Sequence, residues 1–174
     1  MSQTVLVIDT SILCVWLAIP HLDTCGPDDD RWDKPRVDAL IQEHLTEGAT
    51  LVLPLASIIE TGNHIAQNPG DRFVLAQRLC DLLRKAVDGT APYAAFSEQS
   101  VLWEREHMQG LTGEWPPLAA RSISLADATI RDVAHFYARS GLDVRMLTGD
   151  RGLQALSPPA APPALVPRRN RSRL

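Results

Sequence analysis

The stretch Val5-Leu6-Val7-Ile8-Asp9-Thr10-Ser11 decides the fold of this 174-residue chain. Its four consecutive apolar residues predict a strand that is buried on both faces, as strands of a parallel sheet are. Asp9 follows where the chain leaves the core. In open α/β sheets, ligands and chemistry gather in the crevice beyond the carboxyl ends of the strands. Asp9 is therefore a candidate functional acid, and the alternative is an ordinary loop residue that caps the next helix.

Short apolar runs alternate with amphipathic segments along the rest of the chain. We expect further strands at residues 50–53, 91–96 and 144–147. Helices are expected at residues 11–19, 35–47, 57–66, 73–87, 98–107 and 124–140, with a helical turn at 153–156. This alternation predicts an α/β fold, a three-layer α/β/α sandwich with a mostly parallel central sheet.

Three segments do not fit the alternation. Residues 21–34 read as a polar loop whose acids, Asp28 to Asp30, face solvent. Residues 110–121 read as a long irregular connection that could act as a lid. We expect residues 1–157 to form one domain, and residues 158–174 to add a proline-rich edge strand, near 164–166, and a basic tail.

Composition indicates a globular, cytoplasmic protein. The chain is 45% hydrophobic and 22% charged, and no apolar run approaches the roughly 20 residues that span a bilayer. The odd number of widely spaced cysteines, Cys14, Cys25 and Cys80, indicates free thiols in a reducing compartment. The net charge is −4, and removing the four arginines of the last seven residues leaves −8. A general polyanion-binding surface is therefore not expected.

Four acidic residues occupy comparable places relative to the expected strands and helices: Asp9, Glu60, Asp127 and Asp150. Because the carboxyl ends of parallel strands share one edge, we expect all four to line one pocket. Ser57-x-x-Glu60 and Ser124-x-x-Asp127 also have the spacing of a capping box. The two interpretations are compatible, since an acid in the first turn of such a helix also faces the strand-end crevice.

Four converging carboxylates need a counter-charge, because like charges raise each other's pKa. A hard cation with oxygen ligands supplies it, so we expect Asp9, Glu60, Asp127 and Asp150 to hold Mg²⁺ or Mn²⁺. The histidines are scattered and lack zinc-ligand spacing; only His64, one turn after Glu60, is placed near the expected site. Such a site suits phosphodiester hydrolysis.

Other polar residues surround these acids in the sequence. We expect Thr10, Ser11 and Thr148 to orient waters or carboxylates. Arg131 and Arg151 are candidates for phosphate contacts, and a solvated surface position is the equally good alternative for each. Asp132 lies about 140° around its helix from Asp127 and is expected to be peripheral.

The ordered set VLVIDTS, LPLASIIETGNHIA, SISLADATIRDVAHFYARSG and VRMLTGDRGL resembles the PIN-domain nucleases, a family that includes many bacterial toxin ribonucleases. The similarity covers residues 5–156. The resemblance implies a metal-dependent endoribonuclease in which Asp9, Glu60, Asp127 and Asp150 match the family's acidic positions. Thr10 or Ser11, and Thr148, match its hydroxyl positions.

The resemblance also implies partners: an RNA substrate, a homodimer and, for a toxin, a neutralising antitoxin or other regulatory protein. The segments 21–34 and 110–122 make this chain longer than the compact toxins of the family. Two alternatives stay open. One is a catalytically silent domain that binds RNA or protein. The other is a phosphatase with Asp9 as nucleophile, although Ser11 stands where a second acid is normally needed.

Overall fold

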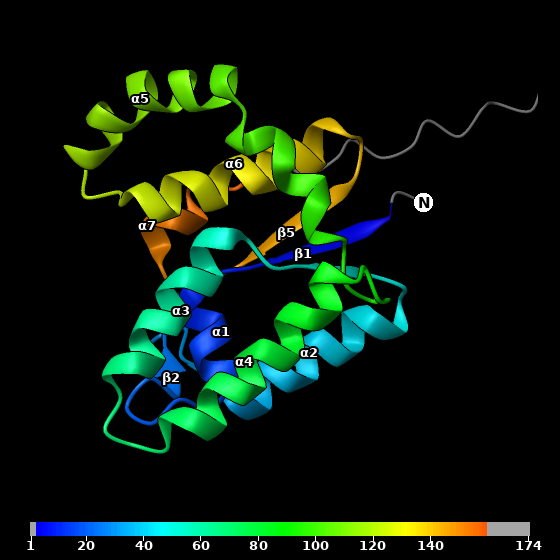
Figure 1. Cartoon of the computed structure of the whole chain (residues 1–174), viewed down its shortest axis with the longest axis vertical. Helices are drawn as coiled ribbons and strands as arrows, with labels where there is room; N and C mark the ends of the chain where they lie inside the picture. Colours follow the sequence, from blue (N-terminus) through cyan, green and yellow to red (C-terminus); the bar gives the residue numbers. More distant parts are fainter. Residues whose placement is uncertain (1–2, 160–174) are drawn as a thin grey trace, which may run out of the picture.

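The computed structural model describes residues 3–159, and Figure 1 shows its arrangement. Its centre is a parallel three-stranded sheet of β1 (Thr4–Ile8), β4 (Thr50–Val52) and β5 (Asp143–Leu147), in the order β4-β1-β5. Leu6 of β1 is opposite Leu51 on one side and Arg145 on the other. All three strands therefore end at one edge, as the sequence predicts.

Helices pack on both faces of β1, because successive side chains of a strand point in opposite directions. Leu6 and Ile8 belong to a buried cluster with α1 (Thr10–Trp16), α2 (Lys34–Thr46), α3 (Leu55–Gln67) and α4 (Arg72–Val87). Val5 and Val7 belong to a second cluster with α6 (Leu125–Arg139) and α7 (Arg151–Gln154). This double burial explains the unbroken apolar run, and the α/β fold class is confirmed.

The strand expected at residues 91–96 is wrong. Tyr93 forms only an isolated parallel bridge to Leu51 of β4. Two backbone hydrogen bonds make this contact, from Leu51 N to Pro92 O and from Ala94 N to Leu51 O. The chain then turns into a 3₁₀ helix, η1 (Phe96–Trp103), so the pairing is not extended.

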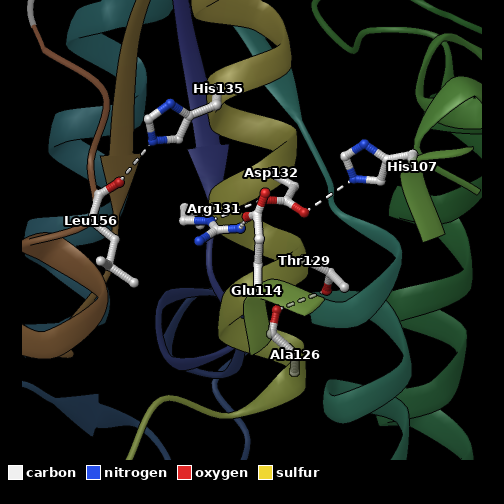
Figure 2. Close-up of polar contacts among 8 residues, drawn as sticks. All are labelled: His107, Glu114, Ala126, Thr129, Arg131, Asp132, His135 and Leu156. Atoms are coloured by element: carbon white, nitrogen blue, oxygen red, sulfur yellow. Dashed lines mark hydrogen bonds and ion pairs between the residues drawn. The ribbon is translucent and has the colours of Figure 1, made fainter. Parts of the chain in front are cut away.

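The helix expected at 98–107 and the irregular connection expected at 110–121 are both corrected. After η1, the helix α5 (Arg105–Ala119) runs through two glycines and two prolines. Glycine weakens a helix without forbidding it, and the fixed φ of proline is close to helical. Tertiary contacts hold α5 against α6: His107 contacts Asp132, and Glu114 contacts Arg131 (Figure 2).

The polar segment 21–34 contains a small antiparallel hairpin of β2 (Thr24–Cys25) and β3 (Trp32–Asp33). Strands of two residues carry no periodicity, so the sequence gives no signal for them. Asp28, Asp29 and Asp30 are exposed, as predicted. The expected edge strand near 164–166 and the arginine tail lie outside the described residues. No helix within residues 3–159 has the length and apolarity to cross a membrane, and the three cysteines are free thiols.

Candidate functional site

One pocket of about 260 Å³ brings the four predicted acids together. Each of them comes from a different place in the fold: Asp9 from the end of β1, Glu60 from α3, Asp127 from α6 and Asp150 from the turn after β5. Thr10 and Ser11 line the same pocket. The shared edge of the parallel strands therefore produces the convergence expected from the topology.

Asp9 is both a helix cap and a pocket acid. It is 4% exposed, and its Oδ1 accepts a hydrogen bond from Thr10 N at 2.6 Å. Its Oδ2 accepts from Ser11 Oγ at 2.7 Å and from Thr148 Oγ1 at 2.8 Å. Burial raises the pKa of Asp9, and these hydrogen bonds partly oppose the rise. A bound cation would lower the cost of keeping this carboxylate ionised.

The three predicted hydroxyls tie the acids to one another. Thr10 Oγ1 donates to Glu60 Oε2 at 2.7 Å. Thr148 Oγ1 donates to Asp9 and accepts from the backbone N–H of Asp150 at 2.9 Å. Ser11 Oγ accepts from the Gly149 N–H at 3.0 Å. These bonds fix the ends of β1 and β5 against each other and orient the carboxylates.

Glu60 does not belong to a capping box, so that alternative is wrong for Ser57. The helix α3 begins at Leu55 after Pro54, two residues before the expected start. Ser57 therefore lies inside the helix, where its hydroxyl is fully buried and has no hydrogen-bond partner among residues 3–159. Glu60 lies in the second turn of the helix, and its side chain is directed by Thr10 instead.

Asp127 does form the capping box predicted with Ser124. Its Oδ2 accepts from Ser124 N at 3.1 Å and from Ser124 Oγ at 2.7 Å. Asp150 caps α7 in a similar way, because its Oδ1 accepts from Leu153 N at 2.9 Å. Both acids also line the pocket, so capping and pocket lining coexist in each.

The charge of the pocket is strongly one-sided. Among the described residues that line it, four are acids and none is lysine or arginine. His64 is the one basic side chain there, as its position one turn after Glu60 predicts. A site of this charge attracts cations and repels anions unless a cation is bound first.

Cys14 and Cys25 also line the pocket, and sequence reasoning did not place them there. Cys14 lies one turn after Ser11 on α1, and this spacing could have predicted that both residues face the same pocket. Cys25 arrives through the hairpin and has no signal in the sequence. Burial raises the pKa of Cys14 to about 11 and also raises that of Cys25. Both thiols therefore stay protonated near neutral pH and are poor metal ligands.

The donor chemistry of the pocket fits a hard divalent cation. One oxygen each of Glu60 (Oε1), Asp127 (Oδ1) and Asp150 (Oδ2) accepts no hydrogen bond from any residue in the described part. Within residues 3–159, no three His, Cys, Asp or Glu side chains already stand together as a ready ligand cluster. The fit therefore rests on oxygen donors that share one pocket, the ligand type that Mg²⁺ and Mn²⁺ prefer.

The two predicted phosphate-binding arginines have carboxylate partners instead of lining the pocket. Arg131 contacts Asp132 at 2.6 Å and Glu114 at 3.0 Å (Figure 2). Arg151 lies next to Asp150 in the chain, but its guanidinium contacts Asp29 of the hairpin segment at 2.5 Å. Asp132 is directed to Arg131 and His107 and is absent from the pocket lining, as predicted.

Among the described residues, the pocket collects four carboxylates and no lysine or arginine, and three hydroxyls orient the acids. Such a set of oxygen donors can hold a hard divalent cation. No protein-family model, curated protein or solved structure matches this chain.

Proposed function

We propose that this protein is a Mg²⁺- or Mn²⁺-dependent endoribonuclease of the PIN type, which hydrolyses phosphodiester bonds in single-stranded or structured RNA. One observation carries the proposal: Asp9, Glu60, Asp127 and Asp150 line one pocket in which the described residues include no lysine or arginine. Four carboxylates collected in this way are most simply explained by a bound cation.

The assignment of the α/β fold to a three-layer sandwich of the PIN type is part of the same proposal. In a three-layer α/β/α sandwich of the PIN type, the acids follow the strand ends and meet at one edge of the sheet. The strand order β4-β1-β5 and the helices on both faces of β1 support this assignment. The motif order over residues 5–156 supports it independently of the geometry.

In the proposed reaction, Asp9, Asp127 and Asp150 would hold the metal, and Glu60 would hold a second ion or position the attacking water. The bound metal supplies Lewis-acid charge and lowers the pKa of water. Glu60 Oε2 is held by Thr10, which leaves Oε1 to accept a proton or hydrogen bond from that water. The bonds to Asp9 from Ser11 and Thr148 keep its carboxylate fixed during the reaction.

Arg151, next to Asp150 in the chain, is the proposed contact to an RNA phosphate. Its present partner, Asp29, is exposed, and pairs of exposed side chains are weak and exchange readily. A phosphate can therefore replace the Asp29 carboxylate. A cytoplasmic location, a homodimer and a neutralising antitoxin that covers the acidic pocket are further parts of the proposal.

The test is cleavage of a pool of structured and unstructured RNAs with Mg²⁺, with Mn²⁺ and with chelator. Wild type, Asp9→Asn and the control Asp88→Asn are compared; Asp88 is an exposed acid outside the pocket. We expect metal-dependent cutting by wild type and by the control, and none by Asp9→Asn. Equal cutting by all three proteins would point to a contaminant, and no cutting by wild type would favour a binding role.

A further inference from the structure

A second pocket lies at the other end of α1 and shares no lining residue with the acidic pocket. Its volume is about 630 Å³, within the range of small-molecule sites. The end of α1, the start of α2, one face of α4 and Tyr93 form its walls; Figure 1 shows these three helices close together. On the seven-residue helix α1, the acidic pocket is lined by residues up to Cys14 and the second pocket begins at Trp16.

This second pocket is basic in an acidic protein. The chain has two lysines, Lys34 and Lys85, and both line it together with Arg78. Asp81 is the one acid among its described lining residues, and it pairs with Arg84 outside the pocket. The pocket therefore carries a net positive charge, whereas the acidic pocket carries a negative one.

Arg78 and Lys85 have no carboxylate partner within the described chain. Lys34, in contrast, pairs with Asp38 and also donates to Trp16 O at the end of α1. Arg78 donates one bond, to Leu17 O at 3.3 Å, which leaves the other guanidinium N–H groups unused. The Lys85 ammonium donates no hydrogen bond to any residue in the range 3–159, and it lies 5.7 Å from the centre of the Tyr93 ring. The hydrogen bond to the end of α1 therefore explains the position of Lys34 in the pocket, but no such bond explains the position of Lys85.

Arg78 and Lys85 are seven residues apart on α4 and therefore lie on the same helix face, two turns from each other. Trp16, which is partly exposed, and Tyr93 bring aromatic rings to the same pocket. A flat ring surface beside unpaired cations suits a ligand with a flat ring and an anionic group. We propose that this pocket binds a nucleoside phosphate, either free or at the 5′ end of an RNA strand.

Isothermal titration with adenosine 5′-monophosphate in chelator tests the site without turnover, so its outcome is independent of the nuclease proposal. Wild type is expected to bind this probe more tightly than adenosine or inorganic phosphate alone. Lys85→Gln removes no hydrogen bond to the described residues and should retain the fold, which thermal unfolding checks. Lys85→Gln should weaken binding of the nucleotide about tenfold or more. Trp16→Leu should weaken it by a similar factor, because stacking on the Trp16 ring is lost.

Arg105→Gln is the matched control, because it removes the same charge at an exposed position of α5 outside the pocket. It should bind like wild type. Equal affinities of Lys85→Gln and Arg105→Gln, or no binding of the probe at millimolar concentration, would overturn the proposal. Competition by a 5′-phosphorylated RNA octamer, but not by its 5′-hydroxyl form, assigns the strand end as the ligand. Binding of the mononucleotide without such competition assigns a free nucleotide.

Discussion

Thermal unfolding with added metal gives the most direct test of the acidic pocket, because it needs no knowledge of the RNA target. A ligand that binds only the folded state at a hundred times its Kd stabilises it by about 2.7 kcal/mol. For 174 residues, the unfolding entropy is roughly 0.37 kcal/mol per kelvin. We therefore expect saturating Mn²⁺ or Mg²⁺ to raise the Tm of wild type by about 7 °C.

Asp9→Asn should abolish this metal-dependent rise, because it removes the most buried of the four carboxylates that line the pocket. The substitution changes the Tm of the metal-free protein as well, so the comparison is the shift within each variant, measured by differential scanning calorimetry. Asp88→Asn serves as the matched control and should keep the full shift, since Asp88 is exposed and absent from the pocket.

The shift should also shrink as the pH falls through the raised pKa of Asp9, because the protonated carboxyl does not bind the ion. An equal rise in Tm of Asp9→Asn and wild type with the ion would refute a metal site at Asp9. An unchanged Tm of wild type at millimolar Mn²⁺ and millimolar Mg²⁺ would refute the metal site as well, whatever the nuclease assay shows.

Three further predictions concern stability. Because burial raises the pKa of Asp9, its stabilising contribution is present below its unfolded pKa and is lost as pH rises through its folded pKa. In chelator, the free energy of unfolding of wild type relative to Asp9→Asn should therefore fall with rising pH in urea titrations, and a flat difference would contradict this. Leu6→Ala, at a fully buried position of the central strand, should cost about 2–5 kcal/mol in the same titrations; a loss below 1 kcal/mol would show that β1 is not the core strand. Asp29→Asn removes an exposed ion pair and should change stability by less than about 1 kcal/mol. If Arg151 is the phosphate contact, the same substitution should strengthen RNA binding by the metal-free protein, measured by fluorescence anisotropy.

The central sheet and the pocket follow from local features of the sequence. The apolar run before Asp9 predicts a doubly buried strand, and parallel strands place Asp9 and Asp150 at one edge. Ser124 and Asp127 carry the capping box in their spacing. These features need only neighbouring residues or the general rules of parallel sheets, so they can be read without tertiary information.

The errors come from segments whose structure depends on distant partners. Residues 110–121 contain glycines and prolines that favour a loop, but contacts from His107 and Glu114 to α6 support a helix there. Residues 91–96 have strand composition, but Tyr93 finds only one bridge partner. Tertiary contacts of this kind override local propensity.

Capping and chemistry use different atoms of the same side chains in this pocket. In Asp127 and in Asp150, one carboxylate oxygen accepts hydrogen bonds at the start of a helix, and the other oxygen has no partner among the described residues. Asparagine caps a helix about as well as aspartate does, so an Asp→Asn change retains the cap oxygen and removes the charge. An Asp→Ala change removes both and should cost roughly 0.5–2 kcal/mol of stability in addition. Loss of metal binding in Asp150→Asn, without the stability loss of Asp150→Ala, is therefore the result that separates a ligand from a cap.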